Sequence, residues 1–177
     1  MASARELELI RAAADGNIER VRTLMNQGVK VNARHKNGMT PLLAAAVTGH
    51  VDVVHALLVQ GADLKARYRN EATVLILAAT QGEADVVELL LNRDANPNER
   101  AKEGSTALLA AAISGHVNVV KKLIKRGAQI DLPDEKGTTP LLGAVVNGHA
   151  PVAELLLDSG ANINARSVAG LSVSAAA

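Results

Sequence analysis

The chain has 177 residues, 48% hydrophobic and 21% charged, so it can bury a sizeable core and lacks the composition of a disordered tail. Because it contains no Phe, no Trp and a single Tyr, the core must consist of Ala, Leu and Val in closely packed helices. Its 19 Lys and Arg nearly balance 18 Asp and Glu, which argues against a generally polybasic binder of nucleic acids or membranes. The absence of Cys excludes disulfides, thiolate zinc sites and cysteine nucleophiles.

The first predicted elements lie within residues 4–34, where charged side chains alternate with Leu and Ile. This pattern is typical of a polar helix and lacks the apolar core of a signal sequence. The charged residues of this helix are Arg5, Glu6, Glu8 and Arg11.

Residues 35–67 predict a helix, a turn, a second helix and a loop. Thr40 is a good N-cap, and Pro41 suits the first helical position, where its missing N–H is no loss. Gly49 supplies the left-handed conformation that ends the first helix. A second helix follows, with an apolar stripe over residues 53–58.

This arrangement recurs every 33 residues. Glycines mark the register throughout the chain: Gly16, Gly49, Gly82, Gly115 and Gly148. The recurrence predicts one domain over residues 1–177, built from stacked units. The units are about 4–34, 35–67, 68–100, 101–133 and 134–166, followed by a truncated unit at 167–177. We expect the first unit to be a polar cap, and the cut last unit suggests that the parent chain is longer.

The unit reads Gly-x-Thr-Pro-Leu, Ala-Ala, Gly-His, Val-Val-x-x-Leu-Leu and Gly-Ala-x-x-Asn-Ala. This pattern resembles the ankyrin repeat and covers nearly the whole chain, from Ala4 to about Gly170. The resemblance implies an all-α solenoid of stacked helix-turn-helix units with β-hairpin loops. It also implies a non-catalytic module that binds another protein through its concave groove and hairpin edge.

Residues 68–100 depart most from the pattern. Glu71 replaces the hairpin Gly, Val74 the Pro, Glu83 the His and Asp94 the Gly that closes the second helix. Asp tolerates a left-handed conformation better than most residues but worse than Gly. We therefore expect this unit and the C-terminal fragment to open most readily.

The histidines are the first candidates for a metal site, and His50, His116 and His149 share one register position. Packed helices lie roughly 8–10 Å apart, whereas zinc ligands lie about 2.1 Å from one ion. We therefore expect these residues to be structural. Because nucleophile signatures and phosphate-binding Gly loops are also absent, we expect no enzyme, no cofactor and no small-molecule substrate.

Basic residues recur along the hairpin edge, where stacking turns each register position into a line along one face. The candidate partner-binding residues of this edge are Arg34, Lys36, Met39, Arg67, Arg69, Arg100 and Lys102. Their positive excess suits a partner with an acidic surface. The alternative is an ordinary solvated loop edge with partial charge pairing.

A second line of candidates lies at the ends of the first helices. Its members are Val47, Thr48, Thr80, Gln81, Ile113, Ser114, Val146 and Asn147. The resemblance implies that partners meet this line on the concave face. A contiguous exposed apolar line marks an interaction site, although neighbouring hairpins could cover it, and no aromatic anchor is present.

We therefore predict a non-catalytic protein-binding module located in the cytoplasm or elsewhere inside the cell. The alternatives are a binder of a polyanion or oligonucleotide along the hairpin arginines, and a regulatory or assembly part of a larger protein. The single potential stacking residue, Tyr68, counts against nucleic acid. The longest apolar runs, such as 74–79, are far shorter than the roughly 18 residues of a membrane span, so no membrane partner is expected.

Overall fold

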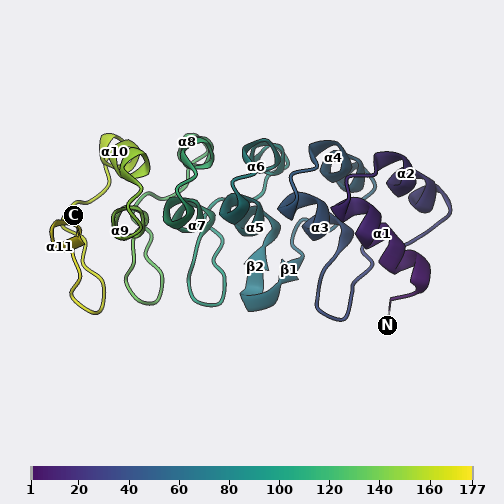
Figure 1. Ribbon diagram of the computed structural model, residues 1–177, viewed down its shortest axis with the longest axis horizontal. Helices are drawn as coiled ribbons and strands as arrows, with labels where there is room; N and C mark the ends of the chain where they lie inside the picture. The colour runs from purple at the N-terminus through teal and green to yellow at the C-terminus, as the bar shows by residue number, and fades with distance from the viewer. Residues whose placement is uncertain (1, 177) are drawn as a thin grey trace.

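The computed structural model describes residues 2–176 and forms an elongated row of helix pairs (Figure 1). An inner row contains α1 (Ala4–Ala14), α3 (Pro41–Val47), α5 (Val74–Gln81), α7 (Ala107–Ser114) and α9 (Pro140–Val146), and α11 (Val173–Ala176) packs against α9. An outer row contains α2 (Ile18–Asn26), α4 (Val51–Val59), α6 (Ala84–Leu91), α8 (Val117–Lys125) and α10 (Ala150–Asp158). No described helix is both long enough and apolar enough to cross a membrane.

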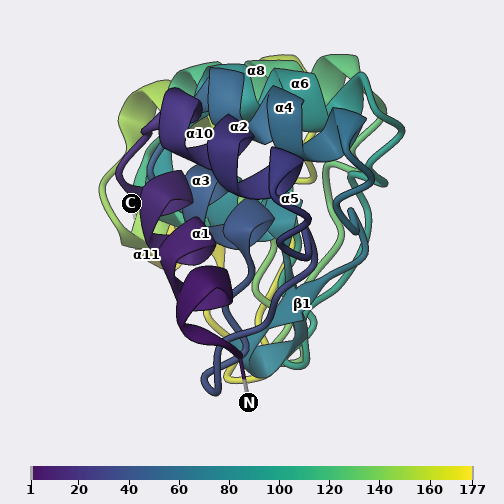
Figure 2. The same cartoon turned by 90° about the vertical axis from the view of Figure 1, so that its right-hand side faces the viewer.

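Each helix pair, together with the hairpin that precedes it, is called a unit here. Unit 1 contains α1 and α2, and units 2 to 5 contain the successive pairs up to α9 and α10. Unit 6 is the last hairpin with α11. Viewed along the row, the outer helices lie on top, the inner helices below them and the hairpins at the bottom (Figure 2).

Buried threonines start the inner helices of units 2 to 5, as predicted for Thr40. The hydroxyl oxygens of Thr40, Thr73, Thr106 and Thr139 each accept a hydrogen bond of 3.2–3.3 Å from the amide three residues later. This bond satisfies one of the free amides at a helix N-terminus. The four side chains are at most 6% exposed, so the caps also fix where each helix enters the core.

The core consists of small aliphatic side chains. Alanine pairs at the centre of the inner helices are fully buried: Ala45 and Ala46, Ala78 and Ala79, and Ala111 and Ala112. Leucines and valines of both rows fill the space around them. The all-α solenoid expected from the sequence is therefore confirmed.

The hairpins are pinned mainly by single backbone hydrogen bonds. In unit 2 the amide of His35 donates to the carbonyl of Met39 (2.9 Å), and units 4, 5 and 6 have the equivalent bond. A two-stranded ladder forms only in unit 3, between β1 (Arg67–Tyr68) and β2 (Ala72–Thr73), apart from one isolated bridge in the described part of unit 6. In the turn of unit 3, Asn70 and Glu71 both have positive φ (57° and 60°).

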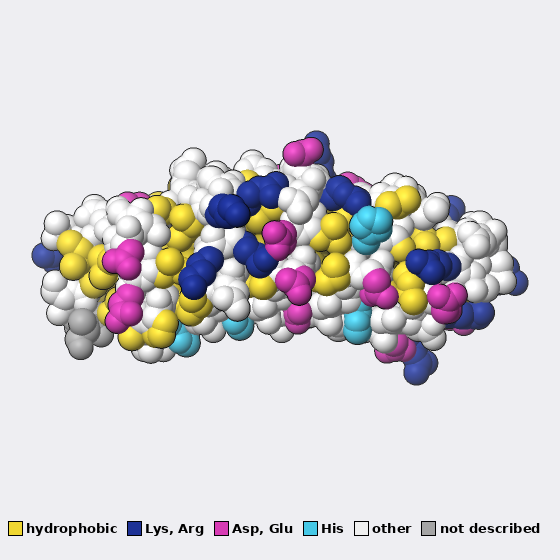
Figure 3. Space-filling model, turned by 90° about the horizontal axis from the view of Figure 1, so that it is seen from above, with side chains coloured by type: hydrophobic (Ala, Val, Ile, Leu, Met, Phe, Trp, Pro, Cys, Tyr) yellow, Lys and Arg dark blue, Asp and Glu magenta, His cyan; other side chains and the backbone are white. Residues whose placement is uncertain are grey.

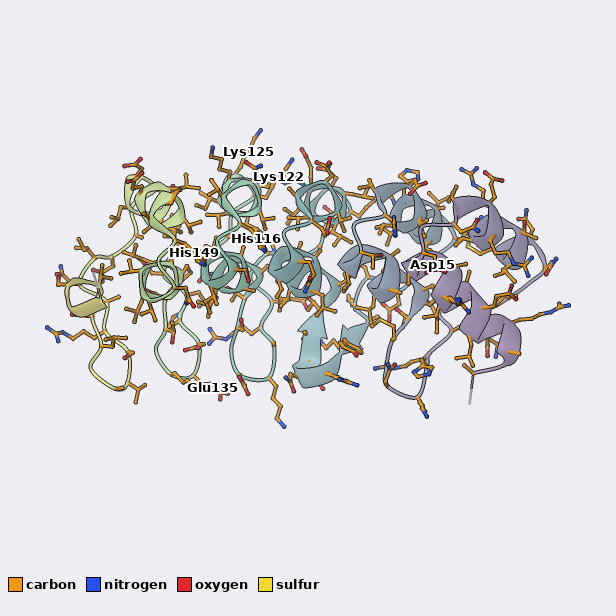
Figure 4. The ribbon with its side chains drawn as sticks, viewed as in Figure 1. Asp15, His116, Lys122, Lys125, Glu135 and His149 are labelled. Carbon is orange, nitrogen blue, oxygen red and sulfur yellow. The ribbon has the colours of Figure 1, made fainter. Side chains whose placement is uncertain are left out.

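Histidines link neighbouring units. The Nε2 atoms of His50, His116 and His149 lie 2.9–3.1 Å from carbonyl oxygens at the C-terminal end of the preceding inner helix. Because a carbonyl only accepts, Nε2–H is the donor. His116 and His149 lie between neighbouring inner helices (Figure 4). A Cβ on Gly82 would lie 2.6 Å from the His116 ring, so the close approach requires Gly there.

Among residues 2–176, the junction between units 2 and 3 lacks two bonds, both of which are present between units 3 and 4 and between units 4 and 5. Glu83 occupies the histidine position, and its carboxylate lies against Gly49. A carboxylate has no N–H group that could donate to the carbonyl of Val47 at the end of α3. Hairpin amides also bond to the preceding hairpin in units 4, 5 and 6, for example Lys102 N to Asn70 O at 2.7 Å. No equivalent bond joins units 2 and 3 among residues 2–176.

We expect the substitution Asp94→Gly to stabilise the protein by about 1 kcal/mol. Asp94 has φ 63°, and a residue with a Cβ is strained in this left-handed region. Urea unfolding measures the change. Arg93→Gly is the control, because Arg93 does not have positive φ. This substitution relieves no strain and only increases the conformational entropy of the unfolded chain. Destabilisation by Asp94→Gly would mean that the Asp94 side chain makes a contact of its own.

We expect Glu83→His to stabilise the protein by about 1 kcal/mol more than Glu83→Ala does. Both substitutions remove the carboxylate, but only His supplies an Nε2–H that can donate to the carbonyl of Val47. Val47 has the position in unit 2 that Thr80, the acceptor for His116, has in unit 3. Chemical unfolding of the three proteins gives the difference. Equal stability of the His and Ala variants would contradict a stabilising role for the histidine bonds.

Candidate functional site

Two apolar pockets lie on one surface, which is formed by the ends of the inner helices and the hairpin residues beside them. We call this the inner surface. The N-terminal pocket encloses about 390 Å³ between α1, α3 and the hairpin of unit 2. The C-terminal pocket encloses about 500 Å³ between α7, α9 and the hairpins of units 5 and 6.

The N-terminal pocket brings together three of the predicted residues, Met39, Val47 and Thr48. Its opposite wall is α1, which contributes Leu7 and Ile10. Leu7 is 41% exposed and was not among the predicted residues. Its helical spacing from Ile10 was the available signal, because residues three apart share one helix face.

The C-terminal pocket brings together Ile113, Val146 and Asn147. Its lining includes Gly143, at a position where units 2 to 4 carry Ala44, Leu77 and Ala110. A Cβ at Gly143 would lie 2.9 Å from Cγ1 of Ile113, so the Ile113 side chain lies directly over the helix backbone.

The hairpin of unit 6 completes the C-terminal pocket. It contributes Val168 and Leu171, neither of which was predicted. Val168 is 82% exposed and Val146 is 52% exposed, so this end of the inner surface presents apolar side chains to solvent.

Between the pockets the inner surface is more polar. Thr80 and Gln81 end α5, and the Thr80 hydroxyl donates to a carbonyl of its own helix (2.8 Å). Ser114 ends α7 and is half-buried. The predicted apolar line is thus divided, with Val47 in one pocket and Ile113 in the other.

The hairpin arginines tie each unit to the next. Arg34 Nη2 donates to the carbonyl of Arg67 (2.9 Å), Arg67 Nη1 donates to that of Arg100 (3.2 Å), and Arg100 Nη2 donates to that of Pro133 (2.6 Å). Arg67 also pairs with Glu99 at 2.9 Å. The sequence signal for this role was the recurrence of Arg every 33 residues, at positions 34, 67 and 100. Each guanidinium bonds the carbonyl of the residue 33 positions further along the chain.

The other three hairpin cations, Lys36, Arg69 and Lys102, are exposed and form no ion pair among residues 2–176. The Arg69 guanidinium lies 5.4 Å from the centroid of the Tyr68 ring. In units 5 and 6 the same register position is Glu135 and Val168, and both line the C-terminal pocket. By the same register, Lys36, Arg69 and Lys102 border the inner surface in units 2 to 4, with Lys36 on the hairpin that lines the N-terminal pocket.

A separate basic cluster lies on the outer row, where Lys and Arg side chains gather over α8 (Figure 3). Lys122 hydrogen-bonds Glu88 of α6, and this bond lowers the pKa of the Glu88 carboxyl. Arg126 bonds the carbonyl of Leu91 (2.7 Å). Two of these cations are thus engaged with the neighbouring unit. In the part of the chain that the structure describes, no three His, Asp or Glu side chains are placed to hold a metal ion.

The comparisons with known proteins give one family. The model described as ankyrin repeats (3 copies) matches the sequence twice, over residues 9–101 and 75–167. The two overlapping matches together span most of the chain, including every inner and outer helix from α2 to α10. No curated protein matches the sequence.

We expect Arg100→Ala to lower the free energy of unfolding by about 1 kcal/mol, because the variant loses the bond to the Pro133 carbonyl. Lys102→Ala is the matched control on the same hairpin and should change stability by less than about 0.5 kcal/mol. Thermal or urea unfolding tests both. Equal effects of the two substitutions would contradict the division of the hairpin cations into bonded and free sets.

Proposed function

Because the chain belongs to the ankyrin repeat family, we propose that it is a non-catalytic module that binds a partner protein on its inner surface. Repeats of this family are in general protein–protein interaction modules and are typically non-catalytic. The proposed contact residues are those predicted from the sequence, together with Leu7, Val168 and Leu171. The observation that carries the proposal is the pair of apolar pockets on one surface.

Exposed apolar side chains support this choice of surface. The described residues expose eight large hydrophobic side chains, and five of them line the two pockets. The five are Leu7, Ile113, Val146, Val168 and Leu171. Clustered exposure of this kind marks interaction sites, whereas single exposed hydrophobics need no explanation. Full burial of one such side chain by a partner contributes roughly 1.5–3 kcal/mol.

The charges of the hairpin edge favour a partner with acidic groups. Lys36, Arg69 and Lys102 are exposed cations in three successive units, and acidic groups opposite them would raise the rate of association and fix its register. The attraction between these cations and acidic groups of a partner is strongest where the partner also excludes water.

Two observations count against binding of an oligonucleotide along the arginines. The guanidinium groups of Arg34, Arg67 and Arg100 already donate to backbone carbonyls. The one aromatic ring, Tyr68, is half-buried with the Arg69 guanidinium over it, so the surface has no open stacking platform for bases.

Site-specific photo-crosslinking tests the surface. We expect a photoreactive residue at Val146 to crosslink a partner protein from native extract, and the same residue at Val59 not to. Val59 is the matched control, because it is 63% exposed but lies on the outer helix α4. Val146→Asp should then weaken binding of that partner at least about tenfold, because a charge would enter an apolar contact.

Crosslinking of the same partner from Val59 but not from Val146 would contradict the proposed surface. So would an unchanged affinity of the Val146→Asp variant, provided that its thermal unfolding matches that of the parent protein.

A further inference from the structure

We propose that the partner segment carries a large apolar side chain at each end and acidic residues between them. This inference rests on the proposed function, because it specifies the ligand chemistry of the same inner surface. It follows from three features of that surface: the content of the pockets, their separation and the charges between them.

The first feature is the content of the pockets. Both are lined mainly by aliphatic side chains, and their volumes of about 390 and 500 Å³ leave room for a Trp, Phe or Leu side chain. The chain itself has one aromatic residue, Tyr68, which lies outside both pockets. Binding energy at interfaces concentrates in large buried anchors, so the anchors must come from the partner.

The second feature is the separation of the pockets. One pocket lies at α3 and the other at α9, which are three units apart in the row. At 8–10 Å between packed helices, three units correspond to roughly 24–30 Å. An extended chain advances about 3.3 Å per residue, so about seven to nine residues span the distance between the anchors.

The third feature is the charge between the pockets. Arg69 and Lys102 lie on the hairpins between the pockets, and Lys36 lies on the hairpin that lines the N-terminal pocket. None of the three has an ion-pair partner in residues 2–176. Glu71 and Glu103 lie near the hairpin tips and reduce the excess, but neither forms an ion pair with these cations. Acidic residues in the middle of the segment complement this stretch.

The charge pattern also sets where the acidic residues must stop. At the register position of the three cations, unit 5 carries Glu135, and Glu135 and Lys136 both line the C-terminal pocket. The row of cations ends at this position, and these two opposite charges offer a partner carboxylate no positive excess. The acidic residues should therefore lie over units 2 to 4, with the second anchor beyond them.

Selection from a displayed library of random 16-residue peptides, with the full chain as target, tests the proposal. We expect enriched peptides to carry two large apolar residues about seven to nine positions apart, with at least two Asp or Glu between them. The affinity of a synthetic enriched peptide is then measured by fluorescence polarisation for the parent protein and its variants.

Two double variants provide a matched comparison. Lys36→Glu with Lys102→Glu should weaken the peptide at least about tenfold, because both changes place like charge against its acidic residues. Lys121→Glu with Lys125→Glu makes the same charge change on the outer helix α8 and should alter affinity less than about twofold.

The outcomes separate the inference from the proposed function. Peptides that lose binding in Val146→Asp but lack the acidic residues or the spacing would overturn the inference and leave the function intact. Peptides that bind Val146→Asp as well as they bind the parent protein would overturn the function itself. A 12-nucleotide oligothymidylate that displaces the peptide, and loses affinity in the Lys36 and Lys102 variant, would replace the acidic peptide by a nucleic acid.

Discussion

The close approach of neighbouring inner helices through alanines is the constraint on which the other contacts depend. Side chains such as Ala45, Ala78 and Ala111 are fully buried and have no bulk beyond Cβ, so the helix backbones come near one another. Only at this spacing can the imidazole of His116 reach a carbonyl of the preceding unit, and the guanidinium of Arg100 a carbonyl of the next. Larger side chains at the alanine positions would lengthen every one of these bonds together.

The fold could be read from the sequence because its signals are local. Thr40, Pro41 and Gly49 each act on their own helix end, and the 33-residue recurrence repeats the same instructions. The inter-unit roles were harder to predict. Arg34 and Lys36 are two residues apart with the same charge, yet one bonds the next hairpin and the other faces solvent, a difference that depends on the hairpin backbone.

Only part of the candidate site was predicted, because its walls also depend on contacts between units. A comparison of register positions finds Gly143 among alanines and a leucine, but the resulting pocket depends on where the hairpin of unit 6 places Val168 and Leu171. Leu7 was overlooked because it takes the register position at which units 2 to 5 carry a buried capping Thr, so the repeat pattern gives no apolar residue there. Sequence periodicity therefore predicted the helix ends that line the two pockets and missed the walls supplied by the first and last units.

The irregular junction between units 2 and 3 lies between the two pockets. Among the described residues it lacks the histidine bond and the hairpin amide bond, so fewer polar contacts oppose rotation of one unit against the other than between units 3 and 4 or between units 4 and 5. A bend at this point would move the N-terminal pocket as a rigid body with units 1 and 2. Such a bend would change the span between the pockets, and with it the length of segment that reaches both.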